Sequence, residues 1–146
     1  METLNTDILV IGGGVNGTSI AMALVARSAG KITLIEKGGL ATGATGRSGA
    51  MVREHYLNVE LVRMASDAKN FFEEWSKEMG YDLKFQTTGR ILLFDESDAG
   101  AAIANGEMNR AEGVNIETLS PEKTMGLIPL ANLEDVSISL YEPEAG

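Results

Sequence analysis

The chain has 146 residues but no cysteine and a single histidine. Without cysteine, disulfide bonds, thiolate metal sites and cysteine nucleophiles are excluded, and we expect no metal site. No run of about 18 apolar residues occurs, so no membrane-spanning helix is predicted. The first residues, METLNTD, lack the basic and apolar segments of a secretory signal. We therefore expect a cytoplasmic protein.

Positive charge is scarce after the first third of the chain. The net charge is −9, yet residues 1–56 carry five Lys or Arg against four Asp or Glu, and residues 57–146 carry seven against seventeen. An acidic chain without a basic stripe binds nucleic acid poorly, so no such partner is expected. The near-neutral first third is where an anionic ligand would be repelled least. Ten of the 17 glycines also lie in residues 1–50.

The first 53 residues predict a strand, a helix, a strand and a long loop. DILVIG (7–12) is apolar on both faces and predicts a buried strand. Residues 15–29 predict a helix that ends at Gly30, and KITLIEK (31–37) predicts a second strand. This order is typical of a right-handed βαβ unit. The loop that follows, 38–53, is long and rich in small residues, which indicates a functional segment.

The rest of the chain predicts alternating helices and strands. Residues 57–79 predict a helix with the charged residues, Lys69 included, mostly on the opposite side from an apolar stripe. Residues 82–96 predict two strands with a turn near Thr88 and Gly89. A helix is expected over 98–112, another from Ser120 and Pro121, and a last strand over 136–141. The stripe of the long helix, expected to pack in the core, comprises Leu61, Met64, Ala65, Ala68, Phe71, Phe72, Trp75 and Met79.

Three spaced glycines separate the first strand from the first helix. In the pattern Gly12-x-Gly14-x-x-Gly17, Gly12 permits a tight turn, Gly14 lets a pyrophosphate approach the backbone, and Gly17 allows close packing of helix on strand. Gly13 has no role of its own in this interpretation. Glu36 follows Gly17 by 19 residues, the position of an acid that binds the ribose hydroxyls. The alternatives are a turn whose glycines serve packing alone and a solvated Glu36.

The glycine spacing by itself predicts a dinucleotide without saying which one. The 38–53 loop favours FAD over NAD, because its glycines, hydroxyls and arginines can donate many hydrogen bonds to a second face of a bound dinucleotide. A simple NAD domain would enter its next helix after a shorter loop. An acid at position 36 also disfavours the 2′-phosphate of NADP.

The run IEKGGLATGATGRSGAMVREHY, followed by QTTGRILLF and YEPEAG, resembles the D-amino-acid-oxidase-like FAD-dependent oxidoreductases. That family includes sarcosine oxidase, glycine oxidase, dimethylglycine dehydrogenase and dye-linked proline dehydrogenases, and the resemblance covers essentially the whole chain. It implies an α/β fold. Residues 1–56 would be the βαβ part and flavin loop of a Rossmann-like FAD-binding domain, and residues 57–146 the start of an α+β substrate domain. The fold would be incomplete in this chain.

The resemblance also implies site residues. Arg53 would be the catalytic residue that pairs with the substrate carboxylate, since its fork of donors matches a carboxylate. A structural salt bridge is the alternative for Arg53, and a plain surface position the alternative for Arg47. His55 would be either a structural residue or a point of covalent flavin attachment. The implied FAD contacts are Gly12, Gly14, Val15, Asn16, Gly17, Glu36, Lys37, Thr45, Gly46, Arg47 and Ser48.

The implied activity is FAD-dependent oxidation of the C–N bond of a secondary amine or α-amino acid such as sarcosine, glycine or proline. Two alternatives stay open: a non-catalytic FAD- or ADP-binding subunit of a flavoenzyme complex, and an NAD-linked dehydrogenase. Members of the family are much longer than this chain. We therefore expect a fragment of a longer enzyme, a split enzyme completed by a second chain, or a short FAD-binding module without activity.

Overall fold

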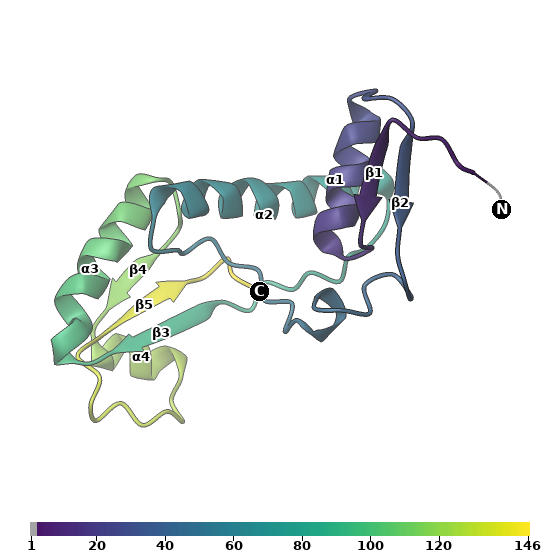
Figure 1. The fold of residues 1–146 in the computed structure, drawn as a ribbon. Coiled ribbons are helices and arrows are strands. Elements are labelled where there is room, and N and C mark those ends of the chain that lie inside the picture. The colour runs from purple at the N-terminus through teal and green to yellow at the C-terminus, as the bar shows by residue number, and fades with distance from the viewer. Residues whose placement is uncertain (1–2) are drawn as a thin grey trace. The chain divides into compact units, whose positions relative to one another are not determined.

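The computed structural model describes residues 3–146. They form two compact units, the first ending at Ala50 and the second spanning Met51–Gly146 (Figure 1). The boundary expected from the sequence follows residue 56. In the structure, the backbone of residues 52–56 hydrogen-bonds to residues of the second unit. The first unit contains β1 (Ile8–Ile11), α1 (Val15–Ala26), β2 (Ile32–Ile35) and the short 3₁₀ helix η1 (Thr45–Arg47).

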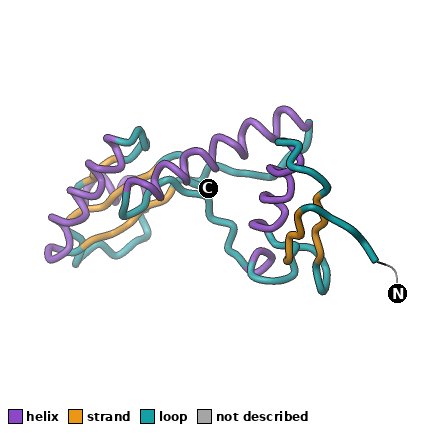
Figure 2. The backbone as a smooth tube through the Cα atoms, turned by 45° about the horizontal axis from the view of Figure 1, so that its top comes forward, coloured by secondary structure: helices purple, strands orange, loops and turns teal. Residues whose placement is uncertain are grey.

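The first unit is the predicted βαβ arrangement. β1 and β2 are parallel, with Ile8 opposite Ile32 and Ile11 opposite Ile35. The helix α1 connects them and packs on both strands, as the tube view shows (Figure 2). After β2 the chain enters the long loop that the sequence predicted, in which η1 is the single short helical turn.

One face of β1 is uncovered, which makes the prediction of a fully buried strand wrong. Leu9 and Ile11 are 49% and 77% exposed, whereas Ile8 and Val10 are half-buried. The cause is the size of the sheet: among residues 3–146, β1 pairs with β2 alone, and α1 packs against it from one side. Parallel sheets are normally covered on both faces. Within the first unit, one face of this two-stranded sheet therefore has no layer of its own.

The second unit is an antiparallel sheet with helices against it. Its sheet has the order β3-β5-β4, with β5 in the middle. Leu140 in β5 lies opposite Leu92 of β3 and Thr118 of β4. The elements of this unit are α2 (Val59–Met79), β3 (Arg90–Phe94), α3 (Glu96–Ala111), β4 (Glu117–Leu119), α4 (Pro121–Leu127) and β5 (Ile138–Glu142).

A small hydrophobic core holds the second unit together. Side chains from the sheet and from α2 and α3 meet there, and partly buried aromatic and aliphatic residues surround them. Gly106 on α3 allows the close approach, because a Cβ at that position would lie 3.0 Å from the side chain of Leu140. The buried members of the core are Val62, Ala102, Val114, Ile116 and Leu140.

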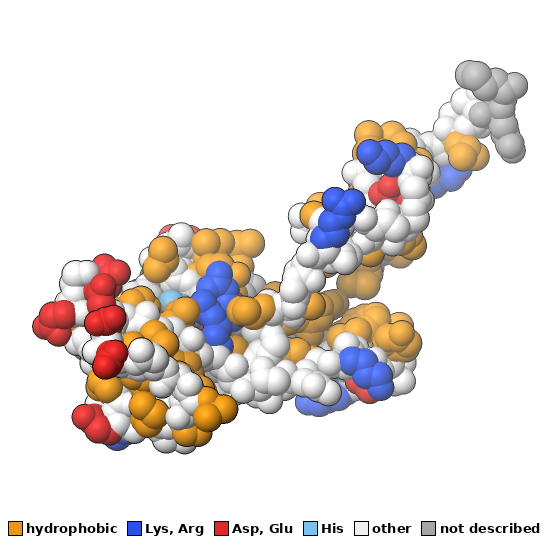
Figure 3. Space-filling view, turned by 90° about the horizontal axis from the view of Figure 1, so that it is seen from below, with side chains coloured by type: hydrophobic (Ala, Val, Ile, Leu, Met, Phe, Trp, Pro, Cys, Tyr) orange, Lys and Arg blue, Asp and Glu red, His pale blue; other side chains and the backbone are white. Residues whose placement is uncertain are grey.

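The buried side of α2 differs from the predicted one. Of the predicted stripe, Leu61, Met64, Phe71 and Met79 are between 41% and 66% exposed, and hydrophobic side chains are visible on the molecular surface (Figure 3). Val62 and Lys69 are buried instead, two helical turns apart on one side of α2. Lys69 is tolerated there because Glu54 and Glu144 both bind its ammonium group.

The segment 82–96 contains one strand instead of the predicted pair. Residues 81–89 are not in a strand, and the backbone N–H groups of Thr88 and Gly89 donate to the carbonyl oxygen of Ala145. The strand β3 pairs with β5, so the turn at Thr88 and Gly89 joins no hairpin. The short strand β4 was not predicted.

The other elements of the second unit match the sequence expectations to within two residues. The α3 helix begins at Glu96 because the Asp95 carboxylate accepts hydrogen bonds from the N–H groups of Ser97 and Asp98. The side chains of Asn58 and Ser120 cap α2 and α4 in the same way. Within residues 3–146, no helix has the length and apolar character needed to cross a membrane.

Candidate functional site

The glycine turn between β1 and α1 has a shape that side chains would block. Gly12 has a φ of +107°, a conformation that L-residues rarely adopt. A Cβ at Gly17 would lie 1.9 Å from the carbonyl oxygen of Gly12. The close approach of helix to strand expected at Gly17 is therefore present, and it brings the first turn of α1 directly over the end of β1.

The N-terminus of α1 presents unused hydrogen-bond donors. Gly14 is the N-cap and offers no capping side chain. The N–H of Val15 donates to the hydroxyl of Thr45 at 3.0 Å, but no acceptor within residues 3–146 bonds to the N–H groups of Asn16 and Gly17. Such groups, together with the helix dipole, make the start of a helix a site for phosphate.

Glu36 lies beside this turn. Its Oε2 atom accepts a hydrogen bond from the N–H of Gly13 at 2.6 Å, and Oε1 accepts one from Gly38 at 2.9 Å. These two backbone donors, Gly13 first, hold the pKa of Glu36 below its usual value, so the group is ionised at neutral pH. Each carboxylate oxygen keeps a further lone pair. Glu36 can therefore accept two more hydrogen bonds from a diol.

A hollow of about 390 Å³ opens at the carboxyl ends of the two parallel strands. It is lined by Ile11, Gly12, Ile35, Glu36 and Lys37. In open α/β sheets, ligands bind outside the carboxyl ends of the strands. The hollow thus combines apolar side chains from two strand ends with the carboxylate of Glu36.

Gly13 has a role that the sequence interpretation missed. It is buried, its N–H binds Glu36, and its carbonyl oxygen accepts a hydrogen bond from Ala41. A Cβ there would lie 2.5 Å from the side chain of Leu40. Gly13 therefore connects the glycine turn to the 38–53 loop. The run of three glycines was the available signal, since the spaced fingerprint requires only two of them.

The predicted FAD contacts in the 38–53 loop differ in burial: Thr45 is half-buried, whereas Arg47 and Ser48 are exposed. Thr45 is half-buried and bonds to the start of α1, and Gly46 is required because a Cβ would lie 2.4 Å from the carbonyl oxygen of Ala41. Arg47 and Ser48 are exposed, and the Ser48 hydroxyl accepts a hydrogen bond from Ala50. Lys37 is also exposed, at the rim of the hollow.

Arg53 belongs to the second unit and has no ion pair within residues 3–146. Its guanidinium carbon lies 4.6 Å from the centre of the Tyr56 ring, a cation–π contact. The neighbouring Glu54 bonds to Lys69 at 2.9 Å instead. The structural salt bridge considered for Arg53 is therefore not formed among the described residues, and its donors are available.

His55 lies in a hydrogen-bond network with α3. Its Nε2 atom is 2.5 Å from Oδ1 of Asn105, and its Nδ1 atom is buried without a partner in the described chain. Asn109 holds both backbone groups of Tyr56, at 3.1 and 2.8 Å. With 5% of its surface exposed and its ring held by Asn105, His55 has the environment of a structural residue. Flavin attachment through His55 stays an untested alternative.

The stability of the chain should depend on pH through His55. Burial is the main cause that lowers the pKa of His55 below its usual 6.5. As the pH falls through 6.5, the unfolded chain takes up a proton that the folded chain resists, so the free energy of unfolding should decrease. Urea unfolding of the 146-residue chain between about pH 7.5 and 5 would measure this slope. In His55→Gln the slope should be flatter, and an unchanged slope would refute the assignment.

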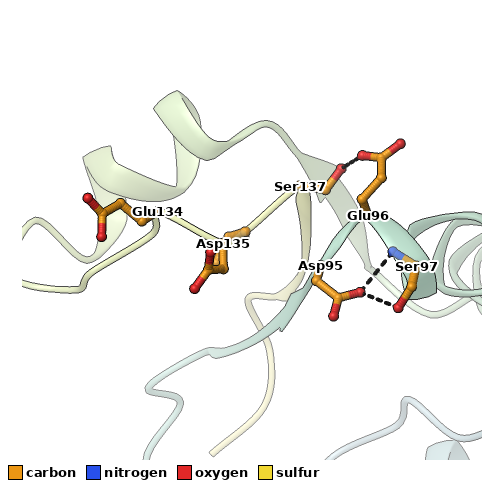
Figure 4. A pocket seen from close by; sticks show the side chains of 7 residues that line it. Asp95, Glu96, Ser97, Glu134, Asp135 and Ser137 are labelled. Carbon is orange, nitrogen blue, oxygen red and sulfur yellow. Dashed lines mark hydrogen bonds between the residues drawn. The ribbon is translucent and has the colours of Figure 1, made fainter.

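A second hollow, of about 700 Å³, is acidic (Figure 4). Two of its acids serve local structure: Asp95 caps α3, and Glu96 accepts a hydrogen bond from Ser137 at 2.8 Å. The remaining charged residues around it, Glu134 and Asp135, are also negative. An anionic ligand would be repelled there, which leaves the glycine turn as the anion site with the better electrostatics.

The comparisons with known proteins agree with this geometry. Residues 7–146 match the DAO family, described as FAD dependent oxidoreductase. The chain belongs to this family. The match bears out the resemblance found in the sequence, and it favours FAD over NAD as the dinucleotide of the glycine turn.

Three similar proteins align with nearly all of the chain. The sarcosine oxidase subunit beta of Arthrobacter sp is 30% identical over 96% of this chain and 36% of its own length. The pyruvate dehydrogenase phosphatase regulatory subunit of Mus musculus is 31% identical over 94% of this chain and 16% of its own length. The crystal structure of L-proline dehydrogenase from P.horikoshii superposes with a TM-score of 0.85 at 30% identity, covering 97% of this chain and 37% of that one.

The chain thus spans between 16% and 37% of the length of these three relatives. The α/β fold class expected from the sequence is confirmed by the superposition. The individual cofactor and substrate contacts, from Gly12 to Arg53, stay predictions.

Proposed function

We propose that the chain holds the adenosine and pyrophosphate of FAD in its first unit. We further propose that it belongs to an enzyme that oxidises the C–N bond of a secondary amine or α-amino acid, such as sarcosine, glycine or proline. One observation carries the cofactor assignment. The free N–H groups at the start of α1, the Glu36 carboxylate and the hollow at the strand ends all lie at one end of the βαβ unit.

The residues at this end fit FAD chemically. The N–H groups of Asn16 and Gly17 would bind the pyrophosphate, and Glu36 would accept hydrogen bonds from the ribose hydroxyls. Ile11 and Ile35 would contact the adenine from the walls of the hollow. Gly12, Gly14 and Val15 would shape the turn, and Lys37, Thr45, Gly46, Arg47 and Ser48 would contact the dinucleotide from the adjoining strand end and loop.

Bound FAD would supply the redox chemistry, accepting a hydride equivalent from the carbon beside the amine nitrogen, so that the amine becomes an imine. This chain would contribute orientation. The guanidinium of Arg53 would bind the substrate carboxylate through two parallel N–H donors. Its contact with Tyr56 limits the orientations of the guanidinium, which reduces the entropy lost when a substrate binds.

We also propose that further polypeptide, in the same or a second chain, covers the first unit in the active enzyme. The exposed apolar side chains of β1 and α1 support this, and so does the greater length of the relatives. The cytoplasmic compartment stays a prediction.

Native purification tests the function. The protein with any chain that accompanies it should contain FAD, released on denaturation and identified by mass spectrometry, and should reduce a redox dye with sarcosine, glycine or proline. FAD without dye reduction on any amine would support the non-catalytic subunit instead, a possibility favoured by the similarity to a regulatory subunit. Absence of FAD would refute both.

Glu36→Gln should weaken FAD binding by about tenfold or more, because hydrogen bonds to a charged acceptor are lost while the shape is kept. The dissociation constant can be measured by titrating the FAD-free protein with FAD and following flavin fluorescence. Glu107→Gln is the matched control, since Glu107 is exposed on α3 in the other unit. Equal affinities for the wild type and Glu36→Gln would remove Glu36 from the cofactor site.

A further inference from the structure

A second arginine of the second unit has unused donors. Arg90 opens β3 and lies opposite Glu142 of β5 in the antiparallel pair. Its Nη1 atom is 4.0 Å from Oε2 of Glu142, too far for a hydrogen bond. Within residues 3–146 neither of these two buried atoms has a hydrogen-bond partner, and no hydrogen bond from the rest of the Arg90 guanidinium is formed.

Glu142 links Arg90 to the segment that carries Arg53. While Oε2 faces Arg90, Oε1 of the same carboxylate accepts a hydrogen bond from the backbone N–H of Glu54 at 2.5 Å. Glu142 is 2% exposed, so its position is fixed by the surrounding structure. One buried carboxylate therefore joins the strand of Arg90 to the residue next to Arg53.

Arg53 and Arg90 keep donors that no carboxylate of the described residues binds. The carboxylates of Glu54 and Glu144 bind Lys69 instead. Burial first, and then the charge of Arg53, lower the pKa of Arg90 from its usual value. The charges of Arg90 and Arg53 also lower the pKa of His55, and that of Glu142 raises it, although burial has the largest effect. Figure 3 shows basic side chains (blue) beside the histidine (pale blue). The buried Nη1 of Arg90 has no hydrogen-bond partner, and Arg53 makes a cation–π contact in place of an ion pair. A bound anion would stabilise such unpaired donors.

We propose that Arg90 is a second substrate-binding residue and forms, with Arg53, a two-arginine site for the carboxylate of the substrate. This inference rests on the proposed function, since it requires an amino-acid substrate. Nη1 of Arg90 faces Glu142 without a hydrogen bond, and the other donors of the guanidinium are also unused, so the fork is available to a ligand. A fork of donors suits a carboxylate better than the single ammonium of a lysine.

The alternative is that Arg90 is only the structural partner of Glu142. The two roles differ in what a substitution changes. A structural role would alter stability and leave unchanged the preference for carboxylates over their neutral amides. A binding role would alter that preference and raise KM for the amino acid more than it lowers kcat.

The test uses the complete FAD-loaded protein and two probes that cannot become imines, tetrahydrofuran-2-carboxylate and tetrahydrofuran-2-carboxamide. Both resemble proline, and binding can be followed by the change in flavin absorbance. Arg90→Gln should lower the preference for the carboxylate over the carboxamide by about tenfold or more. Arg90→Lys, which keeps the charge, should lower it less. Arg63→Gln is the control, since Arg63 pairs with Glu112 on the surface of the same unit, and it should leave the preference within about twofold.

The outcomes separate the two proposals. If the wild type contains FAD and oxidises an amino acid but neither Arg90 variant changes the preference, the role of Arg90 is refuted and the proposed function stands. If Arg90→Gln does not fold, Arg90→Lys decides by the same measurement. If the wild type contains no FAD or oxidises no amino acid, the proposed function fails, and the assignment of Arg90 fails with it.

Discussion

Gly17→Ala should abolish the retention of FAD and destabilise the first unit. A Cβ at position 17 would lie 1.9 Å from the carbonyl oxygen of Gly12, so α1 would have to move away from β1. Overpacking of this kind costs about 1–3 kcal/mol where side chains can adjust, and backbone cannot adjust as a flexible side chain does. The displaced helix start would no longer aim its N–H groups at a pyrophosphate. The ratio of flavin to protein absorbance after gel filtration measures the loss.

Gly43→Ala is the matched control in the same unit. Gly43 is exposed in the loop, and a Cβ there would have no heavy atom within 4 Å. The variant should keep its FAD, because the substitution adds a methyl group in open space. If Gly17→Ala retained as much FAD as Gly43→Ala, the glycine turn would not be the cofactor site.

Lys69→Met should lower the free energy of unfolding by about 3 kcal/mol, because it leaves buried Glu54 without its cation. Glu54 and Lys69 bond at 2.9 Å, with 10% and 9% of their side chains exposed. Burial opposes the charge on Lys69, but the bonds to Glu144 and Glu54 outweigh it and raise the pKa of Lys69 above its usual value. Urea unfolding of the 146-residue chain, followed by the fluorescence of Trp75 on the same helix, measures the change.

Lys77→Met isolates the effect of the buried charge. Lys77 lies in the last turn of α2, is exposed, and makes no ion pair within the described part of the chain. Its replacement should change the stability by no more than about 0.5 kcal/mol. A loss at Lys69 as small as that at Lys77 would show that Glu54 finds water or another donor when the lysine is absent.

Features that depend on nearby residues could be predicted from the sequence. The spacing of Gly12, Gly14 and Gly17 between an apolar strand and a helix was enough to predict the βαβ unit, because the steric reasons for glycine are local to the turn. The caps at Asn58, Asp95 and Ser120 act within three residues of each helix start. For Glu36, its distance along the chain from Gly17 was enough to place it beside the turn.

Features that depend on distant segments could not be predicted. Lys69 looked like a solvent-facing residue because the two carboxylates that neutralise it come from residues 54 and 144. The segment before β3 looked like half of a hairpin because its true backbone partner, Ala145, is at the other end of the unit. Arg90 lies in the QTTGRILLF run, but the sequence did not mark it as a site residue, because its relation to Arg53 arises only when β5 brings Glu142 between the two segments.

The first unit is less buried than the second, and this difference affects folding while the chain is being synthesised. The second unit has a core of its own, whereas α1 contains no buried residue. A 12-residue helix is marginal in water without tertiary packing. Because the ribosome makes the chain from its N-terminus, the first unit emerges before the second, although it has less packing to keep it folded. The exposed apolar side chains of β1 and α1 are therefore a surface that chaperones can bind during synthesis.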